Sequence, residues 1–168
     1  VDSVFGKYKV GSILNVIGNA SPSKEVYAEV IRELQEKSME LIGIPCLYGL
    51  DQIHGASYID GATFFPQEIN QAATFDRNFA FEAGRVCAYE TRAAMVPWTF
   101  APVMDLGRNP LWPRMWESYG EDTYLNAEMG KASVAGLQGD CPSDVDSLHI
   151  AACLKHYMAY GVPQTGQD

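Results

Sequence analysis

The sequence has few basic residues. It contains 12 lysines and arginines against 21 aspartates and glutamates, which gives a formal net charge of −9. Nucleic-acid backbones and anionic membrane surfaces both require a basic face, so this balance argues against either as a partner. The expected ligand is therefore neutral or cationic.

Long apolar runs and nucleotide motifs are also missing. No stretch approaches the roughly 20 apolar residues that span a bilayer. The first residues, Val1 to Val4, include no basic segment leading into an apolar signal region. We therefore expect a soluble chain, or one whose targeting segment has been removed. The sequence contains no dinucleotide-type glycine fingerprint and no Walker loop, so no local motif supports a nucleotide cofactor.

The four cysteines do not form a metal or redox motif. They include no CxxC pair and no His/Cys cluster with zinc spacing. Because Cys46 and Cys153 lie in apolar runs, where a free thiol behaves as a small hydrophobe, we predict free structural thiols rather than a disulfide. The cysteines concerned are Cys46, Cys87, Cys141 and Cys153.

What the sequence does contain is an alternation of apolar runs and amphipathic segments. The 168 residues are 47% hydrophobic and 20% charged, which is enough for one domain with a real core. The apolar runs predict strands at about 9–16, 44–51, 98–105 and 150–157, with helices between them. This order predicts an α/β fold with a parallel sheet and right-handed crossovers. A doubly wound sheet and half of a (β/α)₈ barrel both fit, and length alone favours the first.

Three residues are predicted to cap the helices. Ser21 is expected to begin the first helix with Pro22 at its first position, and Asp76 and Asp122 are expected to begin two later ones. Apolar residues recur at helical spacing, among them Val26, and predict the faces that pack on the core.

Polar residues follow three of the predicted strands. Ligands of parallel α/β proteins bind outside the carboxyl ends of the strands, where Asp51, Arg108, Lys155 and His156 are expected to lie. A carboxylate such as Asp51 can accept hydrogen bonds from two sugar hydroxyls, and the guanidinium of Arg108 is a rigid fork of donors. The purely structural alternative for Asp51 is a helix cap or a carboxylate paired with a basic residue.

Other polar residues have simpler interpretations. His54 is interpreted as a hydrogen-bonded core histidine, and residues 114–122 as a loop held by ion pairs and helix capping. A rival hypothesis is a metal hydrolase, although the spacing of its candidate ligands matches no compact metal motif. Those candidates are Asp51, His54, Asp105 and His156.

Several longer motifs resemble glycoside hydrolase family 3, especially its β-glucosidases. They are GLDQIHG (49–55), GRNPLWPR (107–114), WESYGED (116–122) and AACLKHY (151–157). The resemblance runs nearly end to end. It implies the first four βα units of a (β/α)₈ barrel, although length alone favours a doubly wound sheet. It also implies that the glucose in the first subsite is bound by Asp51, Arg108, Lys155 and His156. It also implies a retaining, exo-acting hydrolase of terminal β-glucosides or oligosaccharides, with no metal or organic cofactor and a periplasmic or extracellular location.

The same resemblance implies that the catalytic pair is missing. The family's nucleophile aspartate belongs to a later barrel strand and its acid/base glutamate to a following domain, so we expect residues 1–168 to be part of the catalytic domain and inactive alone. Residues 157–165 contain no further histidine or aspartate, which favours a glucosidase over an N-acetylglucosaminidase. Open barrel edges would associate with the missing half or with another copy. The alternative is a non-catalytic sugar-binding or assembly module derived from a hydrolase half-barrel.

Overall fold

Three parallel strands form the sheet in a computed structural model that describes residues 1–140 and 145–166. The strands are β1 (Ser12–Leu14), β2 (Leu47–Leu50) and β3 (Trp98–Thr99), in the order β1-β2-β3. The parallel registers pair Ile13 with Tyr48, and Leu50 with Thr99. The predicted parallel sheet is therefore confirmed, with strands shorter than expected.

The fourth predicted strand is wrong as a continuous element. Residues 150–157 run beside β3 but form only two isolated parallel bridges, Trp98 with Ala151 and Val103 with Lys155. The bridges are five residues apart on one segment, from Trp98 to Val103, and four apart on the other, from Ala151 to Lys155. One extra residue therefore shifts the register between them and interrupts the ladder.

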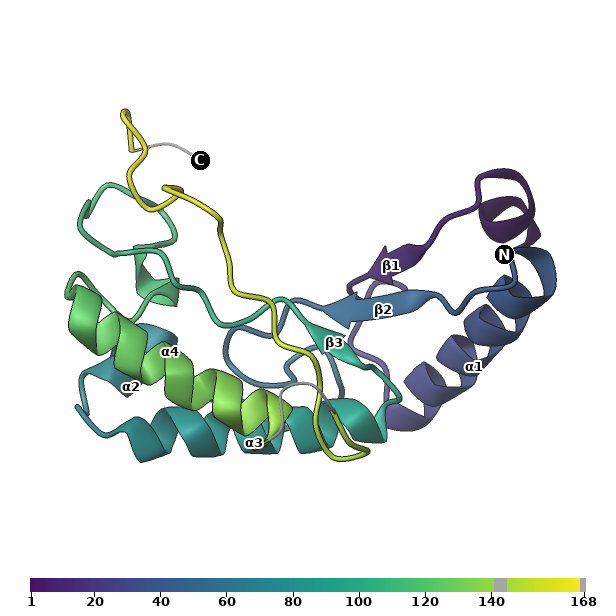
Figure 1. Cartoon of the computed structure of the whole chain (residues 1–168), viewed down its shortest axis with the longest axis horizontal. Coiled ribbons are helices and arrows are strands. Elements are labelled where there is room, and N and C mark those ends of the chain that lie inside the picture. The colour runs from purple at the N-terminus through teal and green to yellow at the C-terminus, as the bar shows by residue number, and fades with distance from the viewer. Residues whose placement is uncertain (141–144, 167–168) are drawn as a thin grey trace.

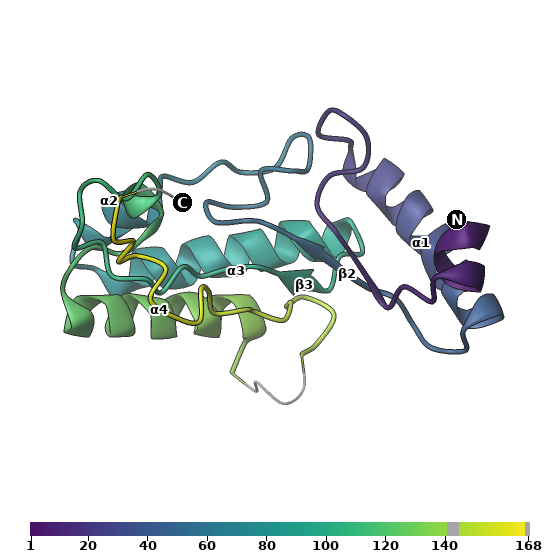
Figure 2. The ribbon, with the colours of Figure 1, turned by 90° about the horizontal axis from the view of Figure 1, so that it is seen from above.

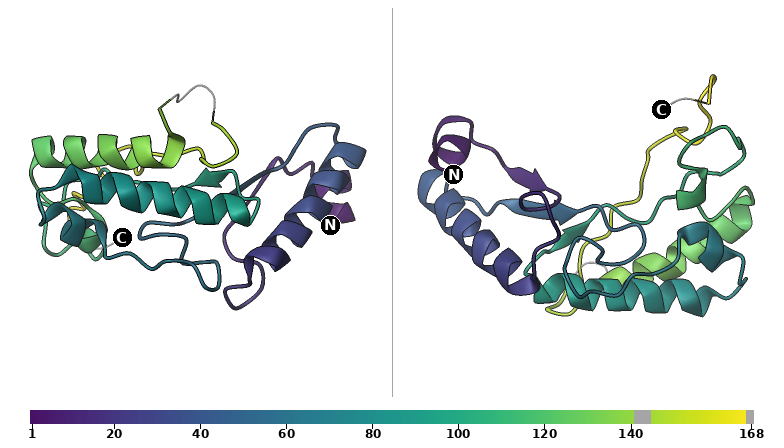
Figure 3. Two further views of the ribbon diagram at one scale, coloured as in Figure 1. Left: turned by 90° about the horizontal axis from the view of Figure 1, so that it is seen from below. Right: turned by 180° about the vertical axis from the view of Figure 1, so that it is seen from behind.

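Long helices lie on one side of the strands, as Figure 1 shows. They are α1 (Lys24–Leu41), α3 (Arg77–Ala93) and α4 (Thr123–Gln138). The shorter elements are α2 (Glu68–Ala72), a π-helical turn (Ser3–Lys7) and a 3-10 turn (Met115–Glu117). Figure 2 and both views of Figure 3 show α3 and α4 side by side. Long helices on one side are typical of a barrel wall, whereas a doubly wound sheet is covered on both faces.

Two of the three predicted caps are confirmed. Asp76 Oδ1 accepts the Asn78 N–H at 2.9 Å, and Asp122 Oδ1 accepts the Leu125 N–H at 2.7 Å. The prediction for α1 is wrong by two residues, because Ser23 caps that helix.

The residues before Ser23 bind a neighbouring loop instead of the helix. Pro22 O accepts the Asp60 N–H at 2.9 Å, and the Ser21 hydroxyl donates to Ser57 O at 3.4 Å. These two contacts hold the chain outside the helix, so α1 begins later than the sequence pattern predicts.

The main core lies between the strands and the long helices. Tyr48 and Leu50 of β2 pack in one buried cluster with Tyr27 and Ile31 of α1. The predicted core position Val26 is 43% exposed, because the neighbouring Tyr27 and Ile31 form the inward face of the helix.

Helices α3 and α4 touch through glycines. A Cβ atom added to Gly84 would lie 2.6 Å from Ser133 O, and one added to Gly136 would meet Phe81 O and lie 2.9 Å from Arg85 N. The two backbones are therefore too close for any side chain at these positions.

Three of the cysteines are free thiols. Cys46 and Cys87 are buried and Cys153 is half-buried, while Cys141 lies outside the described residues. Burial raises the pKa of the Cys87 thiol to about 12, which makes it unreactive at neutral pH. Across residues 1–140 and 145–166, no helix combines the length and the apolar character that a membrane span requires.

Candidate active site

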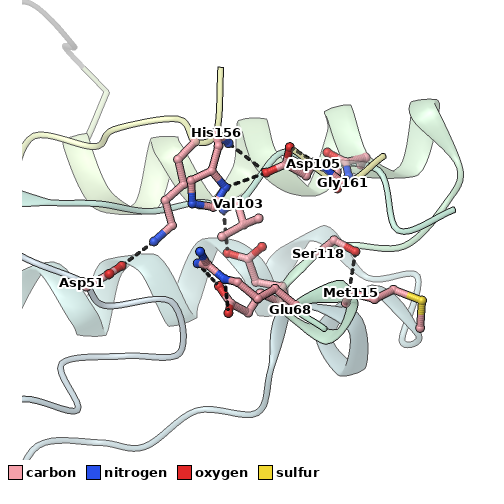
Figure 4. Close-up of polar contacts among 12 residues, drawn as sticks. Asp51, Glu68, Val103, Asp105, Met115, Ser118, His156 and Gly161 are labelled. Atoms are coloured by element: carbon pink, nitrogen blue, oxygen red, sulfur yellow. Dashed lines mark hydrogen bonds and ion pairs between the residues drawn. The ribbon is translucent and has the colours of Figure 1, made fainter. Parts of the chain in front are cut away.

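Lys155 and Asp51 meet across the strand ends. Asp51 directly follows β2, and Lys155 lies opposite Val103 in a parallel bridge. Lys155 Nζ donates a hydrogen bond to Asp51 Oδ1, and their side chains are 11% and 36% exposed. The backbone N–H of Asp51 donates to Asn15 Oδ1 at 3.1 Å, which ties the backbone at Asp51 to the end of β1. An ammonium and a carboxylate therefore stand side by side at the end of the sheet (Figure 4).

His156 is held by Asp105, which the sequence analysis considered only as a metal ligand. Asp105 Oδ2 accepts both the backbone N–H and the Nδ1 of His156 at 2.8 Å, and Oδ1 accepts the Gly161 N–H at 3.3 Å (Figure 4). The Asp105 side chain is 3% exposed and that of His156 is 28% exposed. Because a carboxylate only accepts hydrogen bonds, Nδ1 carries the hydrogen and Nε2 is left to contact a ligand.

Arg108 is not joined to the other three predicted residues. It is exposed, and its Nε donates to the backbone oxygen of Glu121 at 3.4 Å. Within the described part of the chain, no hydrogen bond or ion pair connects it to Asp51, Lys155 or His156. The structure thus joins Lys155 to Asp51 and orients His156, while Arg108 remains a predicted ligand.

The loop beside the site is held by an ion pair, as predicted. Arg114 binds Glu117 through two nitrogens, at 2.7 and 2.6 Å, and Glu117 is 4% exposed. The hydrogen bonds to Glu117 raise the pKa of Arg114, so this guanidinium stays charged. The ring of Tyr160 lies 5.5 Å from the Arg114 guanidinium and 4.6 Å from the ring of His156. Arg114 thus helps to form the wall next to the imidazole.

Glu68 is a buried carboxyl that the sequence analysis missed. It is the first residue of α2 and is 3% exposed, and its Oε1 accepts the Val103 N–H at 3.2 Å. Burial raises the pKa of Glu68 well above 4.5, and the hydrogen bond from Val103 and the positive charge of Lys155 oppose that shift only in part. The sequence offers no signal of this burial, because a glutamate at the start of a helix is usually exposed.

The structure corrects the interpretation of His54 and bears on the metal hydrolase hypothesis. The His54 ring packs edge-on against Phe64 at 4.3 Å, and its buried Nδ1 has no hydrogen-bond partner among the described residues. It is therefore not the hydrogen-bonded core histidine that the sequence predicts. Apart from residues 141–144 and 167–168, which are not described, the chain has no group of three or more His, Cys, Asp and Glu side chains arranged to hold a metal ion. The metal hydrolase hypothesis thus has no ligand set in this part of the chain.

Comparison with known proteins identifies the family. The model of the glycosyl hydrolase family 3 N-terminal domain matches residues 1–167. The chain belongs to glycoside hydrolase family 3. It is 38% identical to a lysosomal β-glucosidase of Dictyostelium discoideum, covering 96% of this chain and 21% of the relative. It is 33% identical to a periplasmic β-glucosidase of Salmonella typhimurium, covering 95% of this chain and 19% of the relative.

Solved structures of the family have the same fold. A β-glucosidase involved in saponin metabolism from intestinal bacteria superposes with a TM-score of 0.86 and 35% identity, covering 100% of this chain and 21% of that one. The barrel-type α/β architecture implied by the motifs is thus confirmed. The chain spans about a fifth of the length of these relatives. Other relatives carry different names, such as a β-D-xylosidase of Arabidopsis thaliana, which is 36% identical and covers 72% of this chain and 18% of the relative.

Proposed function

We propose that this chain supplies the glucose-binding half of the first subsite of a retaining, exo-acting β-glucosidase that needs no metal or organic cofactor. The observation that carries the proposal is the contact of Lys155 with Asp51, beside the oriented imidazole of His156. The ammonium keeps two further donors and the carboxylate keeps further acceptor positions, which together match neighbouring sugar hydroxyls. The substrate is a β-glucoside or an oligosaccharide with a terminal β-linked glucose.

The catalytic pair belongs to other segments in this proposal. A retaining glycosidase needs a nucleophile and an acid/base carboxyl about 5 to 5.5 Å apart. Asp51 is engaged by Lys155, and Asp105 by His156 and Gly161, so neither carboxylate is free to attack the anomeric carbon. We place the nucleophile aspartate and the acid/base glutamate outside residues 1–168, in the remaining half-barrel and a second domain. The chain alone should be inactive.

A sugar titration tests the binding proposal. Glucose added to the ¹⁵N-labelled chain should shift the amide signals of Asp51, Lys155 and His156. Asp51→Ala should abolish those shifts, whereas Asp60→Ala, which changes an exposed aspartate, should leave them intact. Unchanged spectra at saturating glucose would contradict the proposal. An aryl β-glucoside should remain uncleaved in the same samples.

A second candidate substrate is a terminal β-xyloside. The β-xylosidases among the relatives support it, because xylose lacks only the exocyclic hydroxymethyl group of glucose. A parallel titration with xylose distinguishes the two sugars, and tighter binding of xylose would move the proposal to a β-xylosidase.

The alternative of a non-catalytic sugar-binding or assembly module predicts a different result. A longer polypeptide that contains this chain and the segments found in its relatives would bind glucose but cleave no β-glucoside. Cleavage with retained anomeric configuration supports the enzyme and excludes the module.

The open edges of the sheet support a proposal about partners. Among the described residues, β1 pairs only with β2, and residues 150–157 pair only with the β3 side. We expect these edges to bind the rest of the barrel or a second copy. Sedimentation should therefore show association that grows with concentration, and a monomer at all concentrations would contradict this. The names of the lysosomal and periplasmic relatives support a location outside the cytosol.

A further inference from the structure

Strands β2 and β3 separate where the proposed sugar site opens. The Phe100 N–H donates to Leu50 O at 2.9 Å, after which the chain leaves β2 through Asp51. The Val103 N–H lies beyond this point, so β2 offers it no acceptor. A buried N–H without a partner is costly, and Val103 is fully buried.

On the side away from β2, residues 102–104 remain hydrogen-bonded to the backbone of Lys155. The Lys155 N–H donates to Pro102 O at 3.2 Å, and Lys155 O accepts the Met104 N–H at 2.6 Å. The Val103 peptide therefore lies between the backbone of Lys155 and the gap left by β2. Whatever holds Val103 also fixes the backbone from which the Lys155 ammonium reaches Asp51.

Glu68 fills that gap. Its Oε1 accepts the Val103 N–H at 3.2 Å, and Figure 4 shows its carboxyl directed at Val103 from α2. The second oxygen, Oε2, is buried without a hydrogen-bond partner among the described residues. One carboxyl oxygen thus takes the place of a β2 carbonyl at the point where the two strands part.

Glu68 also lines a small polar cavity. The cavity has a volume of about 20 Å³, and its lining includes His54, whose buried Nδ1 is unpartnered in the described part of the chain. This volume accommodates one water molecule. Because burial raises the pKa of Glu68 well above 4.5, the carboxyl keeps its proton to a higher pH than an exposed glutamate does. A protonated carboxyl donates to such a water while its other oxygen accepts from Val103.

We infer that Glu68 is a positioning residue of the sugar site: it holds the Val103 peptide in the gap between β2 and β3 and thereby sets where Lys155 meets Asp51. This rests on the proposed function, because Lys155 and Asp51 are the proposed sugar ligands. Glu68 itself touches neither of them by hydrogen bond among the described contacts, so it acts through the backbone.

Matched variants at Glu68 test the inference. Glu68→Gln keeps an oxygen that accepts from Val103 and should bind glucose within about twofold of wild type. Glu68→Met keeps the length of the side chain but removes the acceptor. It should weaken glucose binding at least tenfold, which is about 1.4 kcal/mol, and should move the Lys155 amide and ¹⁵Nζ signals. Glu82→Met, on the exposed face of α3, is the control and should change neither.

Three further results decide the inference. Wild-type glucose affinity and unchanged Lys155 signals in Glu68→Met would overturn it. If that variant does not fold, Glu68→Asp replaces it, because the shorter carboxyl withdraws from Val103. The Asp variant should show the same signal changes and Glu68→Gln should not. If wild type shows no response to glucose, the proposed function fails, while the Val103 and Lys155 amide signals across the variants still decide the role of Glu68.

Discussion

The α3–α4 interface and the strand-end site are held together in opposite ways. At the interface, Gly84 and Gly136 bring two backbones into contact, while the ion pair of Arg77 with Glu128 lies at the exposed start of α3. At the site, charged and polar groups are bound to one another, as Asp105 is to His156. The interface should therefore be sensitive to added atoms, and the site to lost hydrogen bonds.

The largest effect is expected from adding one methyl group to the interface. Gly136→Ala places a Cβ against the backbone of Phe81 and Arg85, which cannot rotate away. The free energy of unfolding should fall by about 3 kcal/mol, measured by urea denaturation. Gly130→Ala, in the same helix, meets only the flexible end of Met104 and should change stability by less than about 1 kcal/mol. Equal losses in the two variants would contradict the backbone explanation.

The next effect is expected from removing the carboxylate that holds His156. Asp105→Ala leaves the His156 N–H groups and the Gly161 N–H without their acceptor. Hydrogen bonds to charged groups contribute about 1.5 to 3 kcal/mol, so stability should fall by about 2 kcal/mol. The His156 ring signals should also broaden in NMR spectra, as the imidazole loses its fixed orientation. Asp105→Asn keeps the volume and one acceptor and should lose less.

A smaller effect is expected where helix α3 meets the start of the site. Gln52, next to Asp51, donates from Nε2 to the Thr91 hydroxyl at 2.9 Å, and that hydroxyl donates to Gln52 Oε1 at 3.1 Å. Both residues are buried. Thr91→Val removes the hydroxyl but keeps the shape, which should cost about 1 to 2 kcal/mol because the Gln52 amide loses its partner. Thr91→Ser keeps the hydroxyl and serves as the control in thermal melts. A loss as large in the Ser variant would assign the effect to packing instead.

The smallest effect concerns pH. The pKa of Glu68 is raised well above 4.5 in the folded chain, so the folded state retains a proton that the unfolded state releases. Glu68 therefore contributes its full stability below about pH 4.5, and this contribution is lost as the pH rises through the raised pKa. Urea denaturation from pH 4 to pH 8 should show a shallower decline for Glu68→Gln than for wild type. Parallel curves would show that Glu68 titrates normally.

The sequence predicts the order of elements because local chemistry determines it. Asp76 and Asp122 cap their helices through their own side chains, so no distant contact is needed to anticipate them. Ser21 failed as a cap because Ser57 and Asp60, far along the chain, bind the residues before α1. Contacts of that kind leave no periodic pattern in the sequence.

The site could be predicted only where local sequence patterns reveal it. The polar residues at strand ends were visible as breaks in apolar runs, and Lys155 and Asp51 do meet. Glu68 was not found because a glutamate at the start of a helix is usually solvated, and only the parting of two strands explains its burial.

The hydrogen bonds of Asp105 to two parts of the chain have a consequence for how a sugar would bind. One carboxylate fixes both the backbone and the ring of His156, and also the chain at Gly161. The loop is thus ordered during folding, so under the proposed function a pyranose would meet an imidazole that is already oriented. Less conformational freedom remains to be lost on association, and that favours tight capture by a small number of contacts.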